Sequence, residues 1–257
     1  MSYTDPINFD FSGKTAIVTG SASGIGRLTA ERFAEMGASI VLTDINKEVI
    51  DEVAAEIVAK GGKAVAVAAD IRNFDQVMEV RNKAMEVYGR IDFLINSAGG
   101  ASGRINKVKE SFRDWPIEAL DWGIDVNLKG PMYVTRACIG DMIDGGNGGV
   151  IIYLGSAVGS RGGNGGSADY STSKAGLMFG MTKSMAQYGA PYNIRCNAVS
   201  PGPVLTREAM AKTQTLLGRA AEPIEIVNLI TYLCSDQASF ITGSNYAIDA
   251  GRACQHK

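Results

Sequence analysis

The sequence predicts an α/β fold, a Rossmann-type doubly wound parallel sheet of about seven strands with helices on both faces. Short apolar segments rich in β-branched residues alternate along the chain with segments of helical periodicity. A glycine-rich turn follows the first apolar segment at once and opens a helix. Hydrophobic residues make up 46% of the 257 residues, and no linker divides the chain. We therefore expect one domain over residues 1–257.

The first unit is a strand, a turn and a helix. Residues 14–19 read KTAIVT, GSASGIG follows, and apolar residues then recur at helical spacing until Gly37. Gly20 allows a tight turn, while Gly24 and Gly26 let the backbone approach a phosphate group. The amino terminus of the helix adds its dipole to the exposed N–H groups. This unit therefore predicts a dinucleotide-binding turn.

The second strand, SIVLT at residues 39–43, ends at Asp44. A carboxylate at this place can accept hydrogen bonds from the adenosine ribose hydroxyls. An alternative role for Asp44 is to cap the helix that follows. The neighbouring positions Ser23 and Ile45 carry no cation that would bind a 2′-phosphate, so the sequence favours NAD over NADP.

The remaining elements continue the alternation. Two helical stripes end at Gly61 and at Gly89, and later strands are expected at residues 64–68, 91–96, 150–155, 193–199 and 245–249. Apolar strands that alternate with helices predict a parallel sheet covered on both faces. Ligands of such sheets bind beyond the carboxyl ends of the strands, which is where Asn96, Ser156 and Pro201 fall.

Tyr170 and Lys174, in the segment YSTSK, lie four positions apart and would share one face of a helix. A nearby ammonium favours the phenolate and would lower the tyrosine pKa from its ordinary value of about 10. Tyr170 can then exchange a proton with an alcohol or carbonyl oxygen, while Ser156 donates to the same oxygen and a cofactor carries the hydride. The same spacing also occurs on solvated helix faces, so its meaning depends on the other motifs.

Together and in this order, the motifs resemble the short-chain dehydrogenase/reductase family from Lys14 to about Gly251. The resemblance rests on the glycine spacing of the first turn, on NSAG at residues 96–99, on DVNLKG around Asn127 and on YSTSK. It implies a proton relay of four residues: Asn127, Ser156, Tyr170 and Lys174. It implies cofactor contacts at Gly20, Ser23, Gly24, Ile25, Gly26, Asp44, Asp70, Ile71, Asn96, Ala98, Gly99, Tyr170, Lys174, Pro201, Gly202, Val204 and Thr206.

Within that resemblance, Asp70 and Ile71 would contact the adenine ring, and the segment from Pro201 to Thr206 would fold over the nicotinamide carboxamide. The backbone carbonyl of Asn127 would hold a water that joins the lysine to the relay. The separation of Ser156 and Tyr170 is one residue longer than the family pattern. Ser160 is therefore an alternative for the role of the serine.

The expected activity is that of an NAD(H)-dependent oxidoreductase that interconverts a secondary alcohol and a ketone of a small polyol, sugar or hydroxy acid. A short substrate lid near residues 203–218 offers little surface for an acyl chain. A 3-oxoacyl-thioester reductase is the alternative within the enzymes, and a catalytically inactive nucleotide-binding regulator is the alternative outside them. Four basic residues after Asn96 either recognise an anionic substrate or form a solvated face: Arg104, Lys107, Lys109 and Arg113.

The charge and hydropathy of the chain exclude several classes of binding partner. A net charge of −2 gives no electrostatic reason to bind nucleic acid or an anionic membrane, and no apolar run is long enough to cross one. The start, MSYTDPINFDF, lacks a basic apolar leader, so we expect a cytoplasmic protein. His256 is the only histidine and lies one residue from the carboxyl end, so we expect neither histidine-based acid/base chemistry nor a histidine metal site. Four cysteines without metal spacing are expected to be free, buried thiols in a reducing cytosol: Cys138, Cys196, Cys234 and Cys254.

The family resemblance also implies a homotetramer or homodimer, assembled through the helices near residues 127–142 and 170–188. Met178, Met181, Met185 and Tyr188 recur at helical spacing on the second of these helices. Core packing or a contact between subunits is the favoured interpretation, and an adaptable substrate surface is the alternative.

Overall fold

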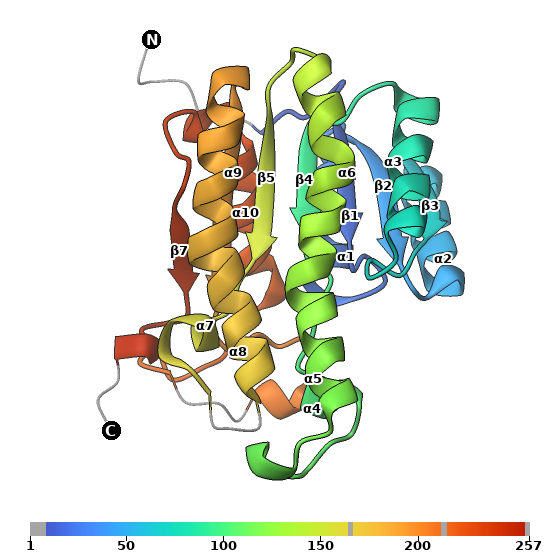
Figure 1. Cartoon of the computed structure of the whole chain (residues 1–257). Helices are drawn as coiled ribbons and strands as arrows, with labels where there is room; N and C mark the ends of the chain where they lie inside the picture. Colours follow the sequence, from blue (N-terminus) through green and yellow to red (C-terminus); the bar gives the residue numbers. More distant parts are fainter. Residues whose placement is uncertain (1–8, 164–166, 212–214, 255–257) are drawn as a thin grey trace.

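The computed structural model describes residues 9–163, 167–211 and 215–254. Its centre is a seven-stranded sheet of order β3-β2-β1-β4-β5-β6-β7, in which every strand pair is parallel. The chain builds the sheet outward from β1 to β3 and then returns to place β4 on the other side of β1. This confirms the predicted doubly wound fold, and the arrows of β4, β5 and β7 all point to the lower edge in Figure 1.

The strands lie at the apolar segments that the sequence marks out. They are β1 (Thr15–Thr19), β2 (Ser39–Asp44), β3 (Lys63–Ala68), β4 (Phe93–Asn96), β5 (Gly149–Leu154), β6 (Ile194–Pro201) and β7 (Asn245–Ile248). The inner strands β1, β4 and β5 are almost wholly buried, since helices cover both of their faces.

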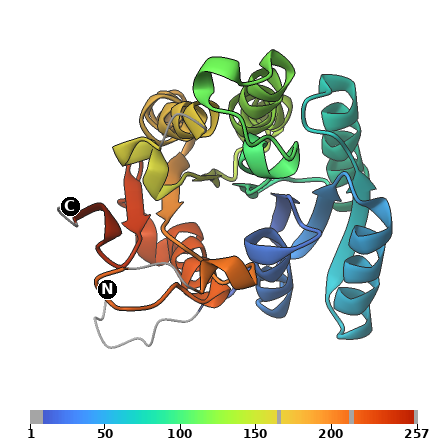
Figure 2. The same cartoon turned by 90° about the horizontal axis from the view of Figure 1, so that it is seen from below.

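Six helices form the two outer layers. These are α1 (Gly24–Glu35), α2 (Lys47–Ala59), α3 (Phe74–Tyr88), α6 (Gly130–Asp144), α9 (Thr182–Gly189) and α10 (Pro223–Cys234). Helices α1, α2 and α10 cover one face of the sheet, while α3, α6 and α9 cover the other (Figure 2). Neighbouring residues of a strand, such as Ile17 and Val18, pack into the hydrophobic cores on opposite faces of the sheet, because side chains alternate across a strand.

Local signals explain where several helices begin and end. Helix α2 is capped by Asn46, whose side chain accepts a hydrogen bond from the N–H of Val49 at 3.4 Å. The alternative role of Asp44 as the cap of this helix is therefore wrong, because Asp44 is the last residue of β2. Helix α3 ends at Gly89, which adopts the left-handed conformation with φ of 70°.

The region between residues 100 and 116, which carries the four basic residues after Asn96, contains α4 (Ser102–Ile105) and a 3₁₀ turn at Phe112–Asp114. Helix α5 (Ile117–Ile124) follows and runs through a π-helical turn, Asp125–Lys129, into α6. The other short helices are α7 (Ala157–Arg161) and α8 (Ala168–Ala175), and α8 continues through a second π-helical turn at Gly176–Met181. Further 3₁₀ turns lie at Ala190–Tyr192, Glu208–Met210, Asp236–Ala238 and Arg252–Cys254.

The methionine stripe faces the core, as the favoured interpretation predicts. Met178 is fully buried, and Met181 and Met185 pack against the same apolar cluster. Tyr188, at the end of the stripe, is exposed and lies beside Tyr192 with 6.4 Å between ring centroids. Within the ranges that the structure describes, no helix combines the length and apolarity needed to cross a membrane.

Candidate active site

The site lies at the carboxyl edge of the sheet, where an open pocket holds about 600 Å³ of empty space. Nine residues that the sequence analysis selects line this pocket: Ile25, Gly99, Ser156, Tyr170, Lys174, Pro201, Gly202, Val204 and Thr206. Five further residues, none of them predicted as a site residue, also line the pocket: Ser97, Leu154, Gly155, Arg207 and Met210. Arg207 and Met210 belong to the predicted lid, and Ser97 belongs to the NSAG segment. The predicted strand ends therefore meet at one pocket, as parallel topology requires.

The glycine turn is built by close backbone approach. Gly20 has φ of +69°, and a Cβ there would lie 2.8 Å from the Cα of Ala98. A Cβ on Gly26 would lie 2.2 Å from the carbonyl oxygen of Gly20, so neither position tolerates a side chain. Helix α1 then begins at Gly24, and Ser23 makes no side-chain cap. The first N–H groups of α1 are thus left for an anion, which fits the diphosphate of a dinucleotide.

Asp44 lies beside this turn at the end of β2. Its Oδ2 accepts a hydrogen bond from the N–H of Ala22 at 3.3 Å, and its Oδ1 accepts one from Asn46 at 3.1 Å. Arg27, the cation of α1 nearest to the turn in sequence, is paired with Glu31 at 2.8 Å and with Glu56 at 2.6 Å. The first cation of α1 is therefore already paired with two carboxylates.

Nine of the predicted cofactor residues are not lining residues of the pocket: the turn residues Gly20, Ser23, Gly24 and Gly26, the neighbouring Asp44, and four residues elsewhere, Asp70, Ile71, Asn96 and Ala98. Asp70 is held by Arg72, whose hydrogen bonds are the main reason that the pKa of Asp70 lies below its ordinary value. Ile71 is buried against Gly130, and the backbone of Ala98 packs against Gly20. Asn96 is only 1% exposed, and its amide atoms have no hydrogen-bond partner in the described part of the chain.

Helix α8 carries Tyr170 and Lys174 into the pocket. The ammonium of Lys174 donates a hydrogen bond to the carbonyl of Leu154 at 2.7 Å and lies 5.6 Å from the centroid of the Tyr170 ring. Ser156, the residue before α7, shares a hydrogen bond with the Tyr170 phenol, and its Oγ accepts from the N–H of Val158 at 3.4 Å. Ser160 is exposed and lies outside the pocket, so the geometry favours Ser156 for the role of the serine.

Asn127 lies in the π-helical turn between α5 and α6 and is fully buried. Its side chain accepts from the N–H of Gly100 and donates to the carbonyls of Gly100 and Gly123, each at 2.9 Å. A Cβ on Gly99 would lie 2.6 Å from Oδ1 of Asn127 and 3.3 Å from Nζ of Lys174. Asn127 thus holds the loop after β4 against Lys174. The sequence motif does not reveal this structural role of the side chain.

The pKa values of the two central groups follow mainly from burial. Burial raises the pKa of Tyr170, while the hydrogen bond with Ser156 and the positive charges of Arg104 and Arg207 act in the opposite direction. Burial also lowers the pKa of Lys174 to about 8. The expectation of a lowered tyrosine pKa is therefore wrong for this structure, because desolvation of the phenolate outweighs the nearby cations.

The basic residues after Asn96 separate into two groups. Arg104, on α4, is close enough to Tyr170 for its charge to act on the phenol. Arg113 is 88% exposed at its side chain and pairs with Asp114 at 3.2 Å, and Lys107 and Lys109 are also exposed. Arg207 is a further cation at the pocket that the sequence analysis did not select. Its position directly after the nicotinamide segment is the signal that could have identified it.

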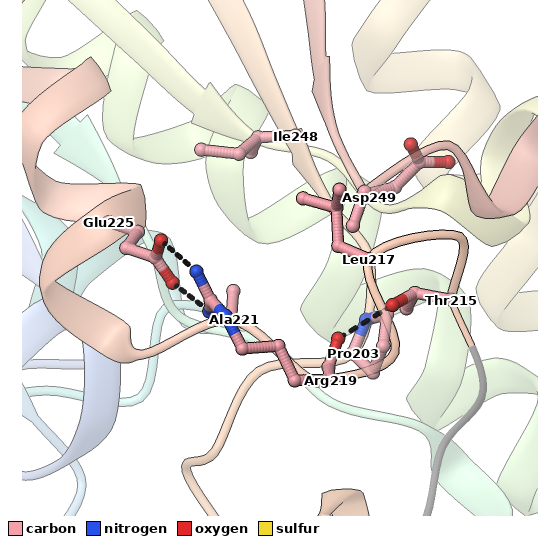
Figure 3. A pocket seen from close by; sticks show the side chains of 9 residues that line it. Pro203, Thr215, Leu217, Arg219, Ala221, Glu225, Ile248 and Asp249 are labelled. Atoms are coloured by element: carbon pink, nitrogen blue, oxygen red, sulfur yellow. Dashed lines mark hydrogen bonds and ion pairs between the residues drawn. The ribbon is translucent and has the colours of Figure 1, made fainter.

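The predicted lid is attached at both ends, although its residues 212–214 lie outside the described ranges. Thr206 closes over the cofactor turn, since a Cβ on Gly24 would lie 3.3 Å from its methyl group. At the far end, Arg219 pairs with Glu225 at 2.6 and 2.8 Å, and Thr215 donates to the carbonyl of Arg219 at 2.7 Å (Figure 3). The pocket drawn there shares no lining residue with the pocket of Tyr170.

No group of three or more histidine, cysteine, aspartate or glutamate side chains among the residues described could hold a metal ion. Cys138, Cys196 and Cys234 are buried free thiols, as expected. Cys254 is also a free thiol, but it is exposed, so its predicted burial is wrong. His256 lies outside the described residues.

Residues 20–253 match the sequence model of a family described as enoyl-(acyl carrier protein) reductase. The 3-oxoacyl-[acyl-carrier-protein] reductase FabG of Thermotoga maritima is 39% identical over 93% of this chain and 97% of its own. L-rhamnose 1-dehydrogenase (NAD(P)(+)) of Azotobacter vinelandii is 35% identical over 93% of this chain and 96% of its own. A crystal structure of a short-chain type dehydrogenase/reductase from Mycobacterium marinum superposes with a TM-score of 0.89 at 35% identity, covering 96% of this chain and 98% of that one.

The buried ammonium of Lys174 predicts a rise in stability with pH. Between about 8 and 10.5 the unfolded lysine binds a proton that the folded one does not, so the free energy of unfolding rises through this window. Relative to Lys174→Met, the wild type should gain up to ~3 kcal/mol across it. Urea denaturation of both proteins at four pH values, at one protein concentration, measures the difference.

Lys183→Met, which removes an exposed lysine of α9, serves as the control and should follow the wild type at each pH. Parallel stability curves for the wild type and Lys174→Met would show that the folded protein keeps this lysine charged to high pH.

Proposed function

Because the chain belongs to the short-chain dehydrogenase/reductase family, we propose that it transfers a hydride between NAD and a secondary alcohol or ketone at the pocket of Tyr170. The observation that carries this proposal is the convergence of Ser156, Tyr170, Lys174 and the uncapped start of α1 on one pocket. The nicotinamide, when bound, accepts or supplies the hydride. The residues of the chain bind and orient the cofactor and the substrate, and they transfer the proton.

In oxidation, the phenolate form of Tyr170 accepts the proton of the substrate hydroxyl and becomes the phenol, and Ser156 donates a hydrogen bond to the same oxygen. The existing bond between the two hydroxyls places them within reach of one oxygen atom. We assign Lys174 to the ribose hydroxyls of the nicotinamide side, since its ammonium has two further donors besides the one bonded to Leu154. Asn127 positions the lysine by holding the loop of Gly99. Reduction uses the same groups in reverse.

We assign the dinucleotide to the turn of Gly20, Gly24 and Gly26, with Asp44 at the adenosine ribose. The closeness of Oδ2 of Asp44 to the N–H of Ala22 places the carboxylate next to the turn. Ile45, the next residue, is 76% exposed and offers no charge to a 2′-phosphate. These observations support NAD over NADP.

For the substrate we propose a small polyol, sugar or hydroxy acid. The lid residues that reach the pocket are few, and two of them, Thr206 and Arg207, are polar. A 3-oxoacyl thioester is the second candidate, and the 39% identity to FabG of Thermotoga maritima favours it. Exposed Leu216 and Leu217, at the outer end of the lid, are the apolar surface that an acyl chain would use.

Tyr170→Phe should lower turnover by ~10²- to 10⁴-fold while NADH binding persists, because a positioned proton donor is lost and the cofactor turn is intact. The measurement is NADH absorbance with polyols, sugars, hydroxy acids and a 3-oxoacyl thioester, beside a fluorescence titration of NADH. Tyr88→Phe, on α3, is the matched control. Near-normal turnover in Tyr170→Phe would exclude Tyr170 from the reaction, and NADH binding without turnover of any substrate by the wild type would favour the regulator alternative.

Asp44→Ala should raise the KM for NAD by ~10-fold or more, since hydrogen bonds to a charged acceptor are lost. Adding Ile45→Arg to that variant should raise the efficiency with NADP, because a cation then stands where a 2′-phosphate would lie. Asp51→Ala removes a carboxylate from the exposed side of α2 and should change neither value. Equal kcat/KM with NAD and NADP in the unmodified protein would contradict the proposal.

We also propose a homotetramer, or failing that a homodimer, assembled through α6 and the helix that runs from α8 to α9. Apolar side chains remain exposed there, including Met132, Phe179 and Tyr188. Light scattering should give the mass of four chains, and Phe179→Asp should reduce it, whereas Val58→Asp on α2 should not. A monomeric wild type at micromolar concentration would disprove assembly.

A further inference from the structure

Two arginines from distant parts of the chain act on the same phenol. Arg207 follows the nicotinamide segment and lines the pocket together with Ser156 and Tyr170, while Arg104 belongs to α4 and is not among the lining residues. Both arginines are exposed to solvent. The positive charges of both arginines act on Tyr170. Nη2 of Arg104 lies 2.9 Å from the place that a Cβ on Gly100 would take, so its guanidinium rests on the loop that Asn127 holds.

Neither guanidinium has a carboxylate partner in the part of the chain that the structure describes. Over residues 9–163, 167–211 and 215–254, no carboxylate forms an ion pair with Arg104 or Arg207, whereas Arg27, Arg81 and Arg219 are each paired. Burial is the main cause that lowers the pKa of Arg104, and the positive charge of Arg207 lowers it further because the two cations repel each other. An anion bound between them would relieve this repulsion.

We propose that Arg104 and Arg207 form an anion-binding subsite, which holds a carboxylate or phosphate monoester of the substrate while its hydroxyl reacts at Tyr170. Guanidinium groups suit this role because they donate paired hydrogen bonds to carboxylate and phosphate oxygens. The inference rests on the proposed oxidoreductase function and narrows its substrate to hydroxy acids or polyol phosphates. Their oxidised products are the corresponding oxo acids or keto phosphates.

The competing role for Arg207 is to bind the diphosphate of the cofactor. Arg207 directly follows Thr206, which closes over the turn at Gly24. A cofactor contact would affect every substrate equally, whereas a substrate contact affects only anionic ones. The two roles are thus separated by comparing substrates that differ in charge alone.

The first experiment compares matched pairs of substrates in the wild type, Arg104→Met and Arg207→Met. Short 2- and 3-hydroxy acids are paired with their amides, and glycerol 3-phosphate is paired with glycerol. We expect the wild type to prefer the anionic member of at least one pair. Each substitution should lower that preference by ~10- to 100-fold, mainly through the KM of the anionic member, because charge-assisted hydrogen bonds are lost. The pair that responds shows whether the anion is a carboxylate or a phosphate ester.

Arg113→Met is the matched control, since it removes an exposed guanidinium from the same region without reaching the pocket. It should leave the preference unchanged. Arg104→Lys and Arg207→Lys retain the charge and should recover part of the preference, which a purely structural role of either arginine would not predict.

The second experiment measures binding without turnover. Calorimetry with malonate and with glycerol 3-phosphate, on the NADH-loaded protein, should show binding that both Met variants weaken and Arg113→Met keeps. Binding of this kind, without turnover of any alcohol or ketone, would support the subsite and refute the proposed reaction. No binding of either anion and no preference for charged substrates would refute the subsite. Weaker NADH binding by Arg207→Met with an unchanged acid-to-amide preference would overturn it in favour of the cofactor contact.

Discussion

A buried ammonium, that of Lys174, donates a hydrogen bond to the carbonyl of Leu154 and so ties α8 to the carboxyl end of β5. Tyr170 lies one turn earlier on α8, and Ser156 lies two residues beyond Leu154. The same bond therefore brings the phenol and the serine hydroxyl together. Burying a cation without a carboxylate partner costs free energy, and the lowered pKa of Lys174 expresses that cost.

Backbone packing at glycines complements this bond on the other side of the pocket. Gly20 and Gly26 let the turn after β1 lie directly against the loop after β4 and against the start of α1. Gly99 then lets the loop after β4 approach both Asn127 and Lys174. Because a Cβ at any of these places would meet atoms within 3 Å, the cofactor turn and the proton relay share one closely packed unit.

The electrostatics of the pocket differ from those of the chain as a whole. The net charge is −2, yet Arg104, Arg207 and Lys174 gather around Tyr170. Field strength in a cleft depends on the local arrangement of charges and on their desolvation rather than on the sum over the molecule. The negative total therefore argues against nucleic acid as a partner but says nothing against a small anion in this pocket.

The sequence by itself determined the strands, the glycine turn and the shared face of Tyr170 and Lys174, because periodicity and special backbone conformations are local properties. Parallel topology then brought Ser156 and Pro201 to one edge. Only the tertiary structure decided the rest: that Asn46 rather than Asp44 caps α2, that Asn127 holds the loop of Gly100, and that Arg104 and Arg207 converge on one phenol. The pKa of Tyr170 was also decided there, because burial and Coulomb interactions depend on groups that folding brings together from distant segments.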